Sequence, residues 1–271
     1  MYLYPKFSGY DFGYFRILGD GLGNLLFPWA RAVCISKRTN LSVIAPTWPQ
    51  FKLGPLLRNE PDKRFYLNLF NHSERYITGG KKLMALAGLP KITEDRFLSG
   101  RCNLSPPSVV YIIGMDGFFA PILDEYEFVR RELLAITNAK HKIGYKISKD
   151  AISVHVRLGD FKQVVKGVKS TYGSFNTQQP ISWYKQMIML FRKVLGHDYP
   201  VIIWSDDVGN KLTELTDLKN SRREFLGSSV ADLIGMSSAR VLIASGSTFS
   251  MWASYLGRMP LVWYPGQLRQ K

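Results

Sequence analysis

The sequence predicts an α/β protein with two halves, each built around a sheet of mainly parallel strands. Strand-like and helix-like stretches alternate along the chain, which is typical of strand–helix–strand units. A polar, lysine-rich stretch at 138–150 interrupts the alternation, and the same rhythm then starts again. We therefore expect two domains, residues 1–145 and residues 146–271, as two nucleotide-type folds that face a cleft.

The first half opens with a predicted strand–helix–strand unit. Residues 15–20 have the composition of a short strand, and the glycines of 21–24 predict a turn. Residues 25–39 have helical spacing, with Pro28 tolerated because it would fall in the first turn. A second strand is expected at 41–46.

The remainder of the first half alternates less regularly. Residues 47–108 are rich in proline and predict loops and short helices. Residues 108–118 predict a strand, and residues 121–137 predict a helix that begins at Pro121.

The second half has clearer boundaries. Its first helix begins at a proline and ends at a glycine, both of which are common at those positions. The predicted strands are 151–157, 200–207, 240–247 and 260–265, and the predicted helices are 180–196, 229–239 and 248–257.

The composition indicates a globular protein with an anionic partner. Hydrophobic residues make up 46% of the chain and charged residues 21%, which excludes a disordered protein. The formal net charge is +15, which predicts contact with nucleic acid, a membrane face or a phosphorylated ligand. A solvated basic surface without a partner is the alternative.

Two further observations concern location. Cys34 and Cys102 are too few for a disulfide framework or a zinc site, so we expect two reduced thiols. The N-terminus lacks the pattern of a signal peptide, and there is no run of about 18 apolar residues. We expect a cytoplasmic protein, with a peripheral contact on the cytoplasmic face of the membrane left open.

Four predicted strand ends carry polar or glycine-rich residues. In parallel sheets, ligands bind outside the carboxyl ends of the strands. The four segments are GDGLGN (19–24), HVRLGD (155–160), WSDD (204–207) and ASGSTFS (244–250).

GDGLGN places three glycines before a predicted helix. Gly21 and Gly23 allow close backbone approach, and the helix start offers N–H groups to a phosphate or a sugar hydroxyl. A dinucleotide site also needs an acidic residue at the end of the next strand, but residues 45–48 contain none, which argues against a dehydrogenase. A plain tight turn is the alternative.

HVRLGD combines an imidazole, a guanidinium and a carboxylate. Arg157 can grip a diphosphate with two parallel charge-assisted hydrogen bonds. His155 lies two residues earlier on the same face of the strand, and Asp160 can orient Arg157 or brace the loop. A buried ion pair is the alternative.

The other two segments are weaker alone. Asp206 and Asp207 project to opposite faces of a strand, so we expect one to accept from a base or ribose and the other to cap a helix. Ser247 and Thr248 can donate to phosphate at a helix start, or Ser247 is an ordinary N-cap.

Taken in order, these motifs resemble those of the bacterial α-1,2-fucosyltransferases, glycosyltransferase family 11. They also resemble, more distantly, the wider α-1,2/α-1,6/protein O-fucosyltransferase superfamily. The matching pieces are GDGLGNLLF (19–27), HVRLGD (155–160), SDD (205–207) and DLIGMSSARVLIASGSTFSMWASYLG (232–257).

The resemblance implies a GT-B glycosyltransferase with two Rossmann-like domains. Residues 1–145 would form the acceptor side and residues 146–271 the nucleotide-sugar-binding side. The implied reaction is the inverting, metal-independent transfer of L-fucose from GDP-fucose to a glycan hydroxyl, in the synthesis of a surface polysaccharide or glycolipid. The implied partners are the GDP-sugar donor and a glycan or lipid-linked oligosaccharide, with no cofactor, no metal and no nucleic acid.

The resemblance also implies roles for individual residues. Arg157 would hold the β-phosphate, His155 would lie beside the donor, and Asp160 would hold the loop or the guanine ribose. Asn24, with Gly21 and Gly23, would face the fucose and the acceptor hydroxyl. Asp206 or Asp207 would meet the guanine, and Ser247, Thr248 and Phe249 would line the phosphates and the base. Catalysis is expected of Arg157, His155 and Asn24.

This sequence departs from the family pattern at three places. Leu158 stands where a second arginine is usual, Leu25 stands where a glutamine is usual, and residues 27–30 read FPWA instead of a tyrosine-containing FxYA. These departures leave the donor sugar and the linkage open, so a sibling enzyme that uses another GDP-sugar is the first alternative. A basic, aromatic-rich nucleic-acid-binding protein is the second.

Overall fold

The computed structural model describes residues 1–72, 74–100, 107–146, 149–159, 161–162, 177–207 and 209–267. They form two compact units, and each is described by itself. Unit 1 comprises Met1–Lys52 and Arg64–Asn138, and unit 2 comprises Leu53–Lys63 and Ala139–Lys271. The division at Asn138 falls at the start of the polar stretch, but Leu53–Lys63 joins the second unit although it lies in the first half of the sequence.

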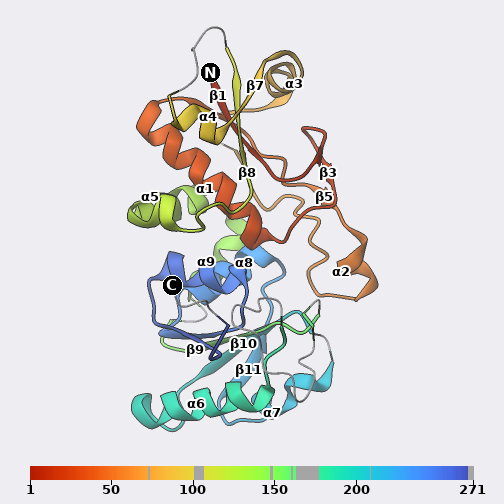
Figure 1. The fold of residues 1–271 in the computed structure, drawn as a ribbon. Helices are drawn as coiled ribbons and strands as arrows, with labels where there is room; N and C mark the ends of the chain where they lie inside the picture. Colours follow the sequence, from red (N-terminus) through yellow and green to blue (C-terminus); the bar gives the residue numbers. More distant parts are fainter. Residues whose placement is uncertain are drawn as a thin grey trace. The chain divides into compact units, whose positions relative to one another are not determined.

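Unit 1 contains one large parallel sheet, one small sheet and several helices (Figure 1). Its elements are β1 (Tyr2–Lys6), β2 (Tyr10–Asp11), β3 (Arg16–Ile17), α1 (Leu22–Thr39), β4 (Ser42–Ile44), β5 (Gln50–Phe51), β6 (Tyr76–Ile77), α3 (Gly79–Gly88), β7 (Lys91–Thr93), α4 (Glu94–Leu98), β8 (Val109–Ile113), the 3-10 helix η1 (Ala120–Glu125) and α5 (Tyr126–Ile136).

The large sheet of unit 1 has the strand order β6-β4-β1-β8-β7, with every pairing parallel. Its first strand is β1, not the predicted strand at 15–20, which contributes only β3 to the small sheet β2-β3-β5. Proline is rare in central strands because it lacks an N–H, so Pro5 concealed β1 in the sequence. The registered pairing of β1 with β4 covers only Tyr2 and Leu3, so Pro5 lies beyond it.

Helix α1 begins three residues earlier than predicted. Pro28 therefore lies inside the helix and not in its first turn, and it cannot donate the usual hydrogen bond to the carbonyl of Asn24. The helix is held by its apolar face, which packs on β1, β4 and β8. Helix α3 covers the opposite face of the sheet, where Ala85 packs with Tyr4 and Val109 (Figure 1).

Unit 2 is a second parallel sheet with helices on both faces. Its elements are α2 (Leu53–Leu57), the 3-10 helix η2 (Ala139–Lys146), β9 (Ile152–Val156), α6 (Ile181–Leu195), β10 (Val201–Ser205), the 3-10 helix η3 (Asn210–Leu212), α7 (Thr213–Thr216), β11 (Ser221–Glu224), α8 (Ser229–Ser237), β12 (Val241–Ala244), α9 (Thr248–Gly257) and β13 (Leu261–Trp263). The strand order is β11-β10-β9-β12-β13, again with every pairing parallel. The predicted α/β class with parallel sheets is confirmed.

Strand β9 is the central strand of unit 2 and is buried on both faces. Ile152 and Val154 pack against α6 in the core cluster that contains Tyr184. Ser153 and His155 point the other way and are also buried, and the Ser153 hydroxyl accepts a hydrogen bond from Trp204 Nε1 at 3.2 Å. Both faces of β9 are therefore buried, one lined by apolar side chains and the other by polar side chains.

No helix among the described residues is both long enough and apolar enough to cross a membrane.

Candidate functional site

The predicted donor residues of unit 2 gather where its strand order reverses. The chain runs outward from β9 to β10 and β11 on one side, and from β12 to β13 on the other. In open α/β sheets, ligands bind at such a reversal, outside the carboxyl ends of the strands. Arg157 follows β9 directly, and the segment Ser245–Ser247 follows β12.

His155 is a buried, neutral side chain that links β9 to α9. Its Nδ1 lies 2.6 Å from the Ser250 hydroxyl and 3.3 Å from the Ser245 hydroxyl, and its ring packs against Phe249 with centroids 5.5 Å apart. Burial, reinforced by the Arg157 guanidinium and only partly opposed by Asp206, places the pKa of His155 well below its ordinary value. A neutral imidazole at neutral pH cannot neutralise a phosphate, so His155 positions its neighbours.

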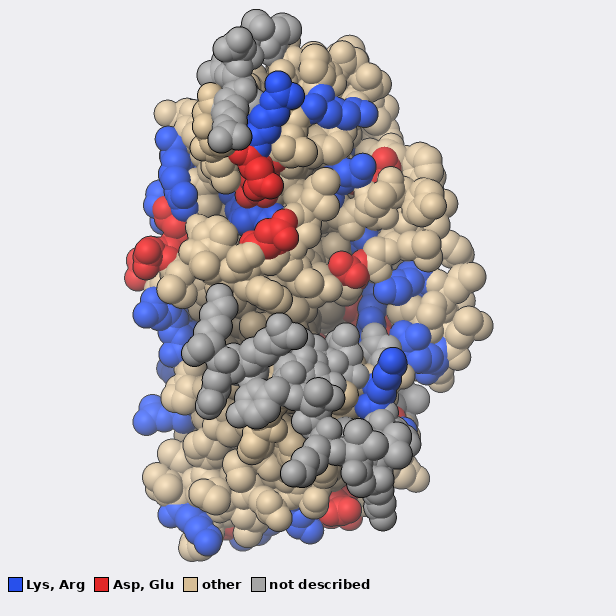
Figure 2. All heavy atoms as spheres, viewed as in Figure 1, with Lys and Arg blue, Asp and Glu red and all other residues tan. Residues whose placement is uncertain are grey.

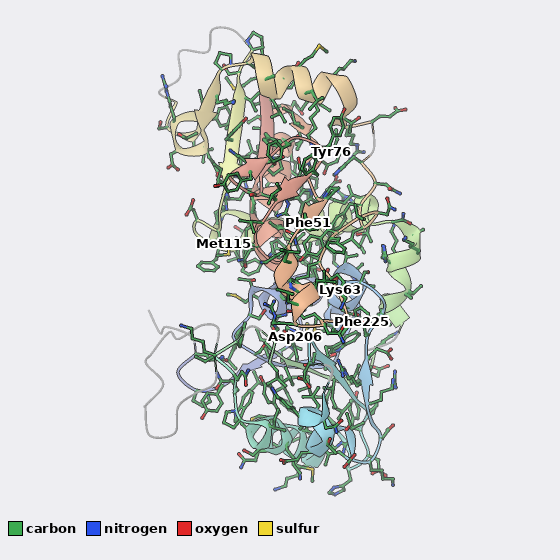
Figure 3. All side chains as sticks on the ribbon, turned by 90° about the vertical axis from the view of Figure 1, so that its right-hand side faces the viewer. Phe51, Lys63, Tyr76, Met115, Asp206 and Phe225 are labelled. Carbon is green, nitrogen blue, oxygen red and sulfur yellow. The ribbon has the colours of Figure 1, made fainter. Side chains whose placement is uncertain are left out.

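Arg157 is held by Asp206 at the end of β9. Its Nη1 lies 3.1 Å from Asp206 Oδ2, and its guanidinium lies over the ring of Phe161. The same carboxylate accepts backbone hydrogen bonds from Leu158 at 2.9 Å and Gly159 at 3.1 Å. Asp206 (labelled in Figure 3) thus fixes both the guanidinium and the loop that follows β9.

The two other predicted carboxylates have different positions. Asp207 Oδ2 accepts from the backbone N–H of Gly209 at 3.0 Å, which stabilises the turn after β10. Asp160 lies outside the described residues. The prediction that Asp160 orients Arg157 or braces the loop is therefore not tested, whereas Asp206 is seen to pair with Arg157.

The start of α9 brings Ser247, Thr248 and Phe249 to the same edge. Ser247 is the N-cap of α9, and its hydroxyl accepts from the backbone N–H of Phe249 at 3.2 Å. The N-terminus of this helix carries partial positive charge from its backbone dipoles. Together with the guanidinium of Arg157, this edge of unit 2 can bind an anionic group such as a diphosphate.

The predicted residues of unit 1 lie at the corresponding reversal of its own sheet, between β1 and β8. Gly21 is the N-cap of α1, Gly23 is buried in its first turn, and Asn24 is half-buried. Asn24 and Asp20 line a pocket of about 200 Å³ whose other walls come from the ends of β1 and β8 and from α1: Lys6, Phe7, Ser8, Gly9, Leu25, Pro28, Ile113 and Gly114. A pocket with a carboxylate, an amide and an ammonium suits a small polar ligand such as a sugar.

Arg31, which the motifs do not contain, fixes the backbone of two residues that line this pocket. It is buried and donates to the backbone carbonyls of Ile113 at 2.7 Å and Gly114 at 3.1 Å, while its Nε is paired with Glu94 at 3.0 Å. A single arginine inside a helical pattern gives no indication of such a role.

Three further residues of unit 2 were not predicted from the sequence. Gln178 Nε2 donates to the carbonyls of Leu158 at 2.6 Å and Phe161 at 2.9 Å, and so braces the loop after β9. Glu60 is buried, pairs with Arg58 at 2.6 Å, and lies 3.4 Å from where a Cβ on Gly159 would stand. Glu60 and Arg58 lie near Gly159 because the segment Leu53–Lys63 belongs to unit 2. Its position in the sequence, within the first half, does not predict this.

Gln267 is the third unpredicted residue. Its side chain is fully buried beside Gly246, and within the part of the chain that the structure describes neither of its amide atoms has a hydrogen-bond partner. A buried amide of this kind destabilises the protein unless a ligand or water satisfies it.

Among the described residues, no group of three or more His, Cys, Asp or Glu side chains is placed to hold a metal ion. Metal independence of the reaction stays a prediction.

Residues 107–260 match the family model of glycosyl transferase family 11. The search among curated proteins gave no match. The match covers more than half of the chain and includes every predicted donor residue of unit 2.

The fold is similar to that of solved fucosyltransferases. The structure of NodZ from Bradyrhizobium superposes with a TM-score of 0.55, at 12% identity, over 99% of this chain and 97% of that chain. NodZ α-1,6-fucosyltransferase soaked with GDP-fucose gives 0.54, at 13% identity, over 97% and 94%. POFUT1 in complex with GDP gives 0.54, at 13% identity, over 97% and 98%. At this identity the similarity establishes the fold.

Proposed function

Because this chain belongs to glycosyl transferase family 11, we propose that it transfers L-fucose from GDP-fucose to a glycan hydroxyl. We propose an inverting, metal-independent reaction that forms an α-1,2 linkage. As the resemblance implies, the residues of unit 2 would bind the nucleotide diphosphate, and those of unit 1 would face the acceptor.

One observation carries this proposal: the fixed guanidinium of Arg157 at the strand-order reversal of unit 2. Asp206 and Phe161 hold the guanidinium from two sides, and the α9 N-terminus lies at the end of the neighbouring strand β12. A cation held in place before the ligand arrives loses little entropy on binding. NodZ was soaked with GDP-fucose and POFUT1 was solved in complex with GDP, which supports the same class of ligand here.

The proposed chemistry depends on stabilising the leaving group. When the bond between the fucose C1 and the β-phosphate oxygen breaks, negative charge builds on GDP. Arg157 and the helix start oppose that charge without reorganising, which is the usual source of the largest catalytic term. His155 acts through Ser250 and Phe249, because it keeps the start of α9 in register with β9.

The acceptor hydroxyl must lose a proton as the new bond forms. Asp20 and Asp116 are the candidate bases in unit 1, where Asp20 lines the pocket with Asn24. The family pattern offers a second path, in which the departing diphosphate takes the proton while Asn24 orients the acceptor. The linkage and the acceptor follow from unit 1, so product analysis by methylation and NMR tests the α-1,2 assignment.

A thermal-shift screen tests the nucleotide and the metal together. The full chain is heated with GDP, UDP, CDP or NAD, each with and without a chelator. A ligand at one hundred times its Kd adds about 2.7 kcal/mol, or roughly 5–10 °C for a protein of this size. We expect this shift with GDP alone and no effect of the chelator. Stabilisation by NAD or UDP in place of GDP would overturn the proposal.

One observation supports a second candidate, a GDP-sugar other than GDP-fucose as the donor. Leu158 stands where the family usually has an arginine, and its side chain is buried in the core cluster of unit 2. The cation that this position usually supplies is therefore missing from the donor side. A panel of GDP-fucose, GDP-mannose and other GDP-deoxysugars, read by release of GDP, identifies the sugar that is transferred.

A further inference from the structure

The small sheet of unit 1 has its polar residues inside and its apolar residues outside. On all three strands the two residues divide in this way. Arg16 is 0% exposed beside Ile17 at 40%, Gln50 is 5% exposed beside Phe51 at 52%, and Asp11 is half-buried beside Tyr10 at 62%. Soluble proteins usually show the reverse pattern, so this inversion needs an explanation.

Most inward polar atoms of the small sheet have a partner within the protein, although Arg16 Nη2 and Gln50 Oε1 have none among the described residues. Arg16 donates to the carbonyls of Thr47 at 3.0 Å and Leu18 at 3.2 Å. Asp11 accepts from the Tyr4 hydroxyl at 2.5 Å and from the backbone N–H of Gly13 at 2.9 Å. The antiparallel strands β2 and β3 form a hairpin. Its inward side is anchored by polar contacts, and its outward side is apolar.

The apolar side extends over the whole hairpin. Phe12 and Phe15 are each about half exposed, with stacked rings whose centroids are 5.1 Å apart, and Tyr14 is exposed beside them. We call the following set the aromatic surface: Tyr10, Phe12, Tyr14, Phe15, Ile17, Leu18 and Phe51. In Figure 2, the part of the molecule where Figure 1 draws β3 and β5 is mostly uncharged, and Figure 3 labels Phe51 on it.

Lysines flank the aromatic surface. Lys52 follows Phe51 and donates to the carbonyl of Gly19 at 2.7 Å, next to Leu18. Lys81 is exposed on α3, and Leu83 of that helix lies 2.8 Å from where a Cβ on Gly13 would stand. The carboxylate within the hairpin, Asp11, is engaged from inside. Asp20, two residues after Leu18, is exposed, so the rim carries these two lysines and one carboxylate.

We propose that the aromatic surface binds the interface of an anionic lipid bilayer. Aromatic side chains with apolar bodies are favoured at the level of the headgroups, and lysines beside them attract anionic lipids. The chain's net charge of +15 has the sign that such a membrane attracts.

The same features disfavour the other occupants. A glycan needs hydrogen-bonding groups for its hydroxyls, but Asp11 and Arg16 direct theirs inward. A second copy of the chain would bring like charges together, because each copy carries +15.

Membrane binding would also place the pocket of unit 1 near the headgroups. Ser8 and Gly9, just before the hairpin, and Asp20, just after it, line that pocket. A lipid-linked acceptor would meet the pocket without leaving the membrane. This last step rests on the proposed function, whereas the membrane contact itself does not.

Vesicle co-sedimentation of the full chain tests the proposal. The vesicles contain phosphatidylcholine alone or phosphatidylcholine with phosphatidylglycerol, and no substrate is present. We expect binding to the anionic vesicles and a drop of about tenfold or more for Phe12→Ser/Phe15→Ser, since each ring loses much of its apolar burial. Lys81→Gln should lower binding by about fivefold on anionic vesicles and leave neutral ones unchanged.

The control is Val194→Ser, which removes an apolar side chain from α6 of unit 2 that is more exposed, at 83%, than Phe12 at 54% or Phe15 at 51%. It should bind as the wild type does. Phe51→Ser serves as a second variant should the double variant fail to fold by circular dichroism.

Four results would overturn the proposal. The wild type does not sediment with anionic vesicles, or Val194→Ser lowers binding as much as the aromatic variants. Alternatively, the aromatic variants bind vesicles normally but raise the KM for a water-soluble acceptor, which assigns the surface to a glycan. A wild-type dimer in solution that the aromatic variants dissociate, with vesicle binding unchanged, assigns it to a second copy.

Discussion

The strand-order reversals of the two units differ in how their polar side chains are held. In unit 2, Arg157, Asp206 and His155 each contact a polar partner within 3.5 Å and are mostly buried. In unit 1, Asn24 and Asp20 stand at the wall of an open pocket of about 200 Å³. A preorganised set of groups suits a ligand of fixed shape and charge, whereas an open pocket suits a partner that varies among related enzymes. If unit 2 holds the donor and unit 1 the acceptor, as proposed above, this chain binds the donor with preorganised groups and leaves room for the acceptor in an open pocket.

Arg157→Ala removes the central cation of unit 2 and has the largest expected effect. Loss of one group that stabilises developing charge typically lowers kcat by ~10²–10³-fold. GDP release from GDP-fucose with an acceptor measures the loss. The matched control is Arg222→Ala, which removes an exposed arginine paired with Glu224 in the same unit. Turnover of Arg157→Ala near that of the control would remove Arg157 from the donor site.

Asp206→Asn tests whether unit 2 depends on positioning. The change removes the ion pair to Arg157 and leaves one amide oxygen for the N–H groups of Leu158 and Gly159. A hydrogen bond to a charged group contributes about 1.5–3 kcal/mol, so we expect GDP to bind about 10- to 100-fold more weakly. Isothermal titration measures the Kd. Tighter GDP binding would show instead that Asp206 restrains Arg157 by neutralising it.

Paired glycine substitutions contrast the two regions directly. A Cβ on Gly159 would lie 2.6 Å from Asp206 Oδ2, whereas a Cβ on Gly21 meets nothing within 4 Å. Gly159→Ala should therefore lower both the melting temperature and GDP affinity. Gly21→Ala meets no steric obstacle but should lower stability by about 0.5–1 kcal/mol, because glycine is preferred to alanine at an N-cap.

The informative measurement for Gly21→Ala is the rate of sugar transfer. Gly21 adjoins Asp20, which lines the unit 1 pocket, although Gly21 itself does not line it. If the acceptor extends from that pocket toward the start of α1, the added methyl group meets it and lowers kcat by roughly tenfold, with GDP affinity unchanged. Unchanged transfer in a folded Gly21→Ala protein would place the reacting groups elsewhere.

The sequence predicted unit 2 better than unit 1 for physical reasons. Strands such as 200–207 and helices such as 180–196 are continuous and bounded by proline or glycine, so local rules suffice. Strand β1 contains Pro5 and stays hidden, because its position depends on pairing with β8, which lies 100 residues away in the chain. Similarly, the adjacency of Glu60 to Gly159 arises from the join of Leu53–Lys63 to unit 2, which no local pattern contains.

The candidate site shows the same limit. The motifs name the residues at the strand ends, and the structure brings Arg157, Asp206 and the α9 start to one edge. They do not say which carboxylate holds Arg157, since Asp160 and Asp206 are equally suitable by type. The pairing of β9 with β10 sets Asp206 beside the end of β9, where it pairs with Arg157, and no local pattern contains that pairing.

Each unit also contains one buried neutral histidine, and acid titration separates their roles. His72 in unit 1 accepts from Trp48 Nε1 at 3.1 Å, and burial lowers its pKa to about 4. The pKa of His155 in unit 2 is also lowered, chiefly by burial. The unfolded chain binds a proton at each site below roughly pH 6.5, while the folded chain does not. Stability is therefore complete above that pH and is lost as the pH falls toward the folded pKa, by at most about 1.4 kcal/mol per pH unit and site.

Two isosteric variants measure these contributions. His72→Gln keeps an acceptor near the position of Nε2, and His155→Asn keeps a polar atom near the position of Nδ1, but neither titrates. Urea unfolding between pH 6.5 and pH 4.5 should give a flatter pH dependence for both variants, by about 2 kcal/mol over the range. Only His155→Asn should also weaken GDP binding, because only His155 contacts the start of α9. An equal loss of GDP affinity in His72→Gln would mean that the two regions are coupled and not separate in the way that their contacts indicate.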